Sequence, residues 1–177
     1  MEAKDDGSFE IEDVPPGRYV VDVSGLPESE RVSVVRTTDR ASRNRIVELA
    51  SGAPSRITVA VSKDAAIISG VARTTAGLPA AGMIVVLAPT SDSMEGAASA
   101  FRSVSTGPEG EFRFGSVAPG TYRVWAWEEV DLDFAADPRF REQFESELVS
   151  VGERSHVRVE LKAAPVSVVR RVETSLR

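Results

Sequence analysis

Apolar and polar residues alternate in short runs along most of the chain, and this pattern is typical of half-buried β-strands. In GEFRFGSVAPGTYRVWA (110–126), Phe112 and Phe114 fall on one face of a strand, while Glu111 and Arg113 fall on the other. Turns rich in glycine and proline separate such runs, so the second half of the chain predicts a small antiparallel β-sandwich of seven strands. The predicted strands are residues 67–73, 83–89, 101–106, 111–114, 121–127, 148–151 and 156–161.

One segment of this half predicts a helix instead. In DPRFREQFES (137–146), Asp137 suits the N-cap and Pro138 suits the first helical position. Phe140 and Phe144 are four residues apart and share one helix face. We therefore expect one short helix between the fifth and sixth strands, with its phenylalanines packed against the face of the preceding strand that carries two tryptophans.

The chain also contains an internal repeat. GSFEIEDVPPGRYVVDV (7–23) matches residues 110–126 at an offset of 103, and Gly52 aligns with Gly152 at an offset of 100. Only six residues precede Gly7, so the first copy is expected to begin in the middle of a hairpin and to lack about three strands. The region of the first copy that corresponds to this helix is rich in valine, and its sequence predicts strands at 31–37 and 45–50 instead. We thus expect an incomplete domain at 1–62 and a complete domain at 63–163.

The C-terminal tail, residues 164–177, follows the last predicted strand. Its VSVVR (166–170) repeats the VSVVR at 32–36. Because β-branched residues favour strands and an incomplete sandwich exposes sheet edges, the tail is expected to add a strand to the first domain. The alternative is that another chain adds this strand.

Composition narrows the classes of function. The net charge of −6 provides no electrostatic footprint for nucleic acid, and no apolar run is long enough to span a membrane. The chain lacks cysteine and has a single histidine, His156, which excludes disulfides, thiol catalysis and a two-histidine metal site within one chain. No cofactor is expected.

The repeated motif carries a family resemblance. DGSFEIEDVPPGRYVVDV and EGEFRFGSVAPGTYRVWAW resemble the signature of carboxypeptidase regulatory-like domains, which belong to the transthyretin-like (prealbumin-like) sandwich group. The resemblance implies an all-β fold of two tandem Greek-key β-sandwiches, the first incomplete. It also implies a large exported bacterial protein, with a location in the periplasm or at the cell surface.

Such domains act mainly as spacers or docking accessories, so the resemblance implies a non-catalytic module. Its expected partners are protein domains of the same parent chain, or a second copy that binds by strand addition. Within the motif, Gly17 and Gly120 are expected to be left-handed turn residues. The hydroxyls of Tyr19 and Tyr122 are expected to bond back to the loop backbone.

The candidate sites are few. Trp125 and Trp127 could form an aromatic platform for carbohydrate, unless the phenylalanine helix covers them. Asp131, Asp133 and Asp137 are weak candidates for calcium, although a solvated acidic loop is the simpler interpretation. No GxSxG motif is present and His156 is expected to be exposed, so we predict no catalytic residue and no enzyme.

Overall fold

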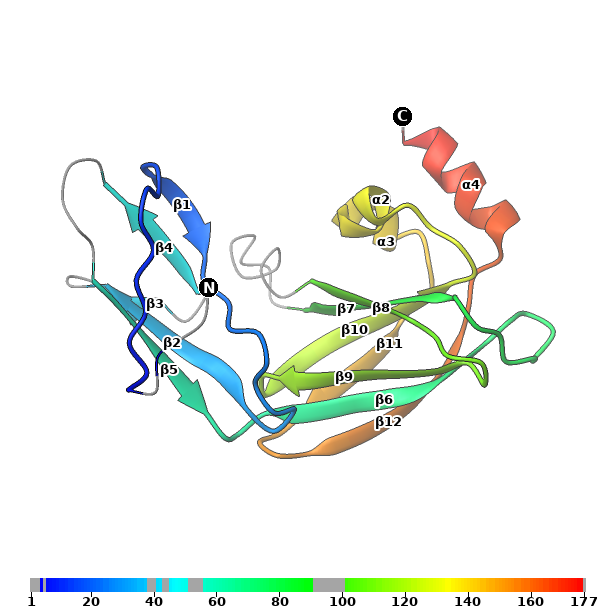
Figure 1. The fold of residues 1–177 in the computed structure, drawn as a ribbon. Helices are drawn as coiled ribbons and strands as arrows, with labels where there is room; N and C mark the ends of the chain where they lie inside the picture. Colours follow the sequence, from blue (N-terminus) through cyan, green and yellow to red (C-terminus); the bar gives the residue numbers. More distant parts are fainter. Residues whose placement is uncertain are drawn as a thin grey trace.

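The computed structural model describes residues 4, 6–37, 41–42, 45–50, 56–90 and 101–176. Strands dominate it, and those before Lys63 pair only with one another, as do those after it, within the described part of the chain. Figure 1 shows the two groups of strands side by side. The elements are β1 (Gly17–Val20), β2 (Arg31–Thr37), β3 (Ala41–Ser42), β4 (Ile46–Leu49), β5 (Ile57–Ser62), β6 (Ala66–Arg73), β7 (Ile84–Pro89), β8 (Arg102–Ser105), β9 (Glu111–Val117), β10 (Gly120–Trp127), α2 (Leu132–Ala136), α3 (Pro138–Arg141), β11 (Glu147–Val151), β12 (His156–Lys162) and α4 (Val166–Ser175).

Strands β6–β12 form a sandwich of two sheets, which we call the C-terminal sandwich. One sheet has the order β11-β10-β7-β8 and the other has the order β12-β6-β9, so all seven predicted strands are confirmed. The expectation of a fully antiparallel sandwich is wrong at one pair, because β12 runs parallel to β6. The turn between β11 and β12 carries the chain from one sheet to the other, and this crossing sets the direction of β12.

The main hydrophobic core lies between these two sheets. Phe112 and Phe114 of β9 enter it as predicted, together with Tyr122 and Val124 of β10. At the centre of β6, Gly70 allows the carbonyl of Val159 to approach closely, and a Cβ at this position would overlap the carbonyl oxygen.

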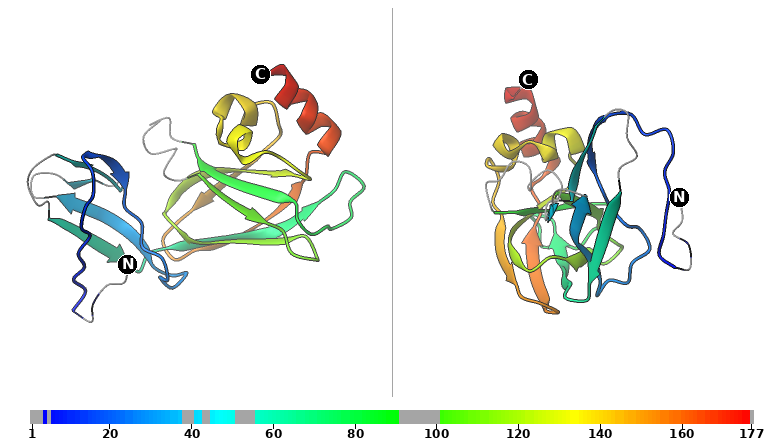
Figure 2. Two further views of the ribbon diagram at one scale, coloured as in Figure 1. Left: turned by 45° about the horizontal axis from the view of Figure 1, so that its top comes forward. Right: turned by 90° about the vertical axis from the view of Figure 1, so that its left-hand side faces the viewer.

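A second cluster lies on the outer face of the four-stranded sheet, beneath the helices (Figure 2). The predicted helix begins as expected, with the Asp137 side chain accepting from the Arg139 amide and Pro138 in the first turn. However, α3 ends at Arg141 rather than at 146, and a separate helix, α2, precedes it. The chain leaves the helix early, and Phe144 then packs edge-on against Trp127.

The prediction that the tail adds a strand is wrong. Residues 166–175 form helix α4, whose buried Val169 joins the cluster around Trp127. Val169, Val172 and Leu176 follow a helical spacing, so one face of the helix can cover this cluster. Among the described residues, no helix is long and apolar enough to cross a membrane.

Strands β1–β5 form two small sheets, β1-β4 and β3-β2-β5, which we call the N-terminal sheets. The strands predicted at 31–37 and 45–50 are confirmed as β2 and β4. Both tyrosines of the repeat pair with a valine of a neighbouring antiparallel strand, Tyr19 with Val47 and Tyr122 with Val149.

The expected hairpin at 7–23 is only half formed, because residues 8–12 are not a strand. Their counterpart in the second copy is β9, which pairs with β6. β5, the counterpart of β12, pairs with β2.

Candidate functional site

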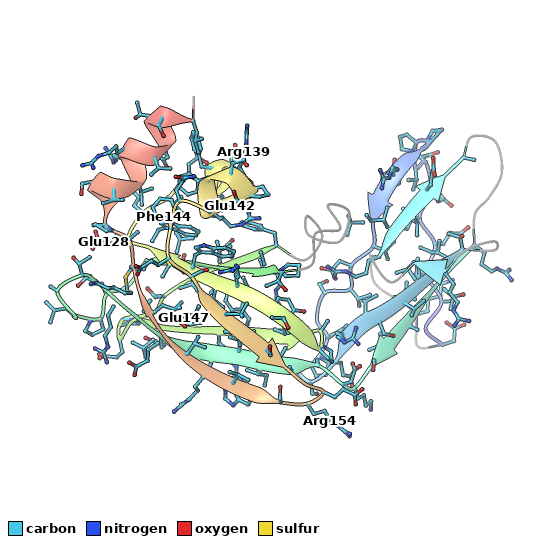
Figure 3. The ribbon with its side chains drawn as sticks, turned by 180° about the vertical axis from the view of Figure 1, so that it is seen from behind. Glu128, Arg139, Glu142, Phe144, Glu147 and Arg154 are labelled. Carbon is cyan, nitrogen blue, oxygen red and sulfur yellow. The ribbon has the colours of Figure 1, made fainter. Side chains whose placement is uncertain are left out.

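The tryptophan pair is closed to solvent. Trp125 is 6% exposed and Trp127 is 0% exposed. Their ring planes are nearly parallel, with centroids 6.4 Å apart, and the rings of Phe140 and Phe144 pack on Trp127 at 5.9 and 5.6 Å. Figure 3 shows Phe144 between the helices and the sandwich. The two tryptophans are therefore not available as the aromatic platform considered as an alternative, because Phe140 of α3 and the following Phe144 pack over Trp127.

Arg141 fixes this cover in place. Its guanidinium donates to the carbonyl oxygens of Ala135 and Ala136 at 2.7 and 2.8 Å, at the C-terminal end of α2. It also lies over the rings of Phe101 and Trp125, while the indole of Trp125 donates to the Arg141 carbonyl at 3.1 Å. Burial lowers the pKa of Arg141 from its ordinary value. The sequence pattern gave no sign that this arginine would be buried.

Of the three aspartates considered as weak calcium ligands, Asp131 and Asp137 cap helices. Asp131 accepts from the Asp133 amide at 2.9 Å and caps α2. Asp137 caps α3 and binds Arg139 at 2.7 Å, and these contacts lower the pKa of Asp137. Within the described ranges, no group of three or more acidic, histidine or cysteine residues could hold a metal ion.

The repeated motif has the tyrosine role that we expected. The Tyr19 hydroxyl donates to the Pro15 carbonyl and the Tyr122 hydroxyl donates to the Ala118 carbonyl, both at 2.7 Å. Burial raises the pKa of Tyr122 above its ordinary value.

The prediction that Gly17 and Gly120 are left-handed is wrong. Gly17 has no positive φ, and Gly120, with a φ of 159°, is close to extended. The left-handed residues are instead Asp13 at 57° and Ser116 at 54°. These two residues align with each other at the repeat offset of 103. The bend of the motif therefore comes before its prolines, and both copies make it with a residue other than glycine.

One pair of polar side chains could not be foreseen from the sequence. The Ser69 hydroxyl and His156 Nε2 lie 2.7 Å apart on β6 and β12, although 87 positions separate them. His156 is exposed, as predicted. A groove of about 550 Å³ lies elsewhere, between α4 and residues 129–131, and neither Ser69 nor His156 lines it. The contact between Ser69 and His156 is exposed on the face of the sheet.

The largest difference between the two copies concerns exposure of aligned apolar residues. Ile11, Val23 and Val61 are 56%, 37% and 43% exposed, whereas their counterparts Phe114, Ala126 and Leu161 are 0%, 5% and 6% exposed. We call Ile11, Val23 and Val61 the open core positions. They are exposed at positions where the second copy has buried core residues.

Comparisons with known proteins gave no match to any family model and no significant match to a curated protein. Solved structures gave matches at low similarity. BcpA, the major pilin subunit of Bacillus cereus, has 15% identity and a TM-score of 0.40, covering 85% of this chain and 40% of that chain. The group B streptococcus pilus 2b backbone protein has 16% identity and a TM-score of 0.36, covering 85% and 53%.

A third structure, from Pseudomonas aeruginosa, is described as a candidate carbohydrate-binding protein. It has 15% identity and a TM-score of 0.39, and the match covers 56% of this chain and 88% of that chain. The chain thus spans about half or less of the two pilus proteins. The chain is an all-β protein built of sandwich-forming sheets.

Proposed function

We propose that the chain is a non-catalytic β-sandwich module that serves as a spacer and protein-docking unit of a larger exported bacterial protein. In this proposal residues 1–62 form an incomplete domain and residues 63–163 a complete one. The observation that carries it is the exposure of the open core positions, whose counterparts in the second copy are buried. A location in the periplasm or at the cell surface follows from the family resemblance.

The second copy indicates what would cover these positions. There, Phe112 and Phe114 lie opposite Gly70 and Ile68 of β6, so a neighbouring strand covers the aligned segment. The partner that fits is therefore an extended segment with alternating apolar residues, from another part of the parent chain or from a second copy. Burying a residue of the size of Ile11 or Val61 contributes about 1.5–3 kcal/mol.

A peptide with the sequence of residues 64–74 tests this docking role in trans. Fluorescence anisotropy of the labelled peptide, titrated with the full chain, should show saturable binding. Ile11→Asp should weaken this binding about tenfold or more, because it places a charge at an apolar contact. Val20→Asp is the matched control, because Val20 is equally exposed but aligns with the outward-facing Arg123.

Two results would contradict the docking role: no saturable binding of the peptide, or equal loss with Ile11→Asp and Val20→Asp. The carbohydrate alternative is weaker, because the tryptophan surface assigned to it is covered by Phe140 and Phe144.

A further inference from the structure

A loop of the N-terminal sheets lies directly on the C-terminal sandwich. The Glu28 carboxylate accepts from Arg113 Nε at 2.9 Å and from Arg113 Nη2 at 2.7 Å. The backbone takes part as well, because the Ser116 amide donates to the Glu28 carbonyl at 2.8 Å and the Ser116 hydroxyl donates to the Pro27 carbonyl at 3.4 Å. We call residues 26–30 the clasp loop.

A distortion in β9 prepares this contact. The register between β6 and β9 shifts between Ala66 and Ile68, next to the left-handed Ser116. The Ser116 amide is thereby available to the clasp loop instead of to β6. Gly115 provides the room, because a Cβ there would lie 2.7 Å from Cγ of Glu28.

The same loop is also tied to the segment that joins the two parts, Lys63–Ala65. The Ala65 amide donates to the Ser29 carbonyl at 3.3 Å. Asp64, at the centre of this segment, binds Arg31 at 2.7 Å and accepts from the Arg154 amide through its backbone carbonyl at 3.1 Å. Figure 3 shows Arg154 at the end of the sandwich that faces the N-terminal sheets.

We propose that the clasp loop locks the N-terminal sheets and the C-terminal sandwich into one rigid body. Neighbouring domains on a short linker ordinarily move relative to each other. Here the linker and β9 are both held by the same loop, so bending at Lys63–Ala65 would break contacts on two sides. The Glu28–Arg113 pair is exposed and contributes little alone, so the backbone bonds and the fit at Gly115 carry the joint. The inference deepens the proposed spacer role, and its biological use rests on that proposal.

The absence of cysteine allows a direct test. Spin labels on Thr58→Cys in β5 and Glu160→Cys in β12, both exposed, report the distance between the two parts by pulsed electron paramagnetic resonance. We expect one narrow distance distribution. Gly115→Val should widen it about twofold, since the new side chain displaces Glu28 and restores ordinary domain motion. Gly152→Val is the matched control, because a Cβ at Gly152 meets no atom within 4 Å.

A charge exchange between Glu28 and Arg113 tests the joint independently, in case Gly115→Val does not fold. Glu28→Arg should widen the distribution, because it replaces a weak attraction by repulsion between two arginines at the contact. Glu28→Arg with Arg113→Glu removes this repulsion and should narrow the distribution again. A broad distribution in the parent chain, or widths unchanged by both Gly115→Val and Glu28→Arg, would overturn the rigid joint. Neither result alters the peptide titration at Ile11, so failure of the joint is distinct from failure of the docking role.

Discussion

The two tyrosines of the repeat show how one hydroxyl can close the same turn in different surroundings. Each donates to the carbonyl four residues earlier at 2.7 Å. Tyr122 is buried in the main core, whereas Tyr19 is only partly buried at the small cluster of the N-terminal sheets. A hydrogen bond that water cannot replace contributes more to stability, so the two bonds should differ in their effect.

We expect Tyr122→Phe to lower the free energy of unfolding by about 1 kcal/mol, and Tyr19→Phe to lower it less. Because burial raises the pKa of Tyr122, the stability from its neutral hydroxyl is complete below the ordinary tyrosine value of 10.0. It is lost as the pH rises through the higher pKa of the folded state. Urea denaturation at neutral and alkaline pH measures both effects. An equal or larger cost at Tyr19, or a difference between the parent and Tyr122→Phe that grows above this pH, would contradict the interpretation.

At the scale of elements, one pentapeptide adopts two structures. VSVVR is part of strand β2 at 32–36 and part of helix α4 at 166–170. In β2 it pairs with β5, whereas in α4 it follows Pro165 and its Val169 is buried in the tryptophan cluster. Local propensity is thus overridden by the surface against which the segment packs.

Replacement of Val169 by aspartate should detach α4 from the sandwich. Val169 is 1% exposed, and loss of its burial costs about 2 kcal/mol before the cost of the buried charge is added. Iodide quenching of tryptophan fluorescence should then increase, because α4 covers the cluster around Trp127. Val168→Asp is the control, since Val168 is already partly exposed. Equal quenching in both variants would show that α4 does not protect this cluster.

The sequence predicted most elements of the C-terminal sandwich, because each strand there has one buried face and is bounded by turns rich in glycine and proline. It also predicted the cap of α3, which depends only on Asp137 and its neighbours. It missed the α4 helix, the β2–β5 pairing and the clasp loop, since each depends on contacts between segments far apart in the chain. For the candidate site, the sequence predicted only that the first domain is incomplete. It did not identify Ile11 and Val61, because their exposure depends on how the strands are arranged in three dimensions.

Across the whole molecule, the N-terminal sheets should open locally at a lower free-energy cost than the C-terminal sandwich. Among the described residues, the buried cluster of the N-terminal sheets consists of Val32, Val35 and Val47, whereas the core of the C-terminal sandwich draws on both of its sheets. Regions with little buried apolar surface open more readily than a full core.

Hydrogen exchange measures this difference directly. Amides of β1 and β4 should exchange about tenfold or more faster than amides of β6 and β10, because opening of the small cluster costs less free energy. Addition of the residue 64–74 peptide should slow exchange in the N-terminal sheets and leave β6 and β10 unchanged. Uniform exchange across both parts would argue that they unfold as a single cooperative unit.

The parallel pairing of β6 and β12 has a mechanical consequence. β6 is the first strand of the sandwich and β12 is its last, and these strands pair from Ile67 to Arg73. Once α4 has detached, the chain is therefore held at its two ends by this pair. A pulling force on the two ends therefore acts along the strands in opposite directions. It loads all bonds of the ladder together in shear, whereas an antiparallel terminal pair would be unzipped one bond at a time. A module built this way resists stretching better than its thermodynamic stability alone indicates.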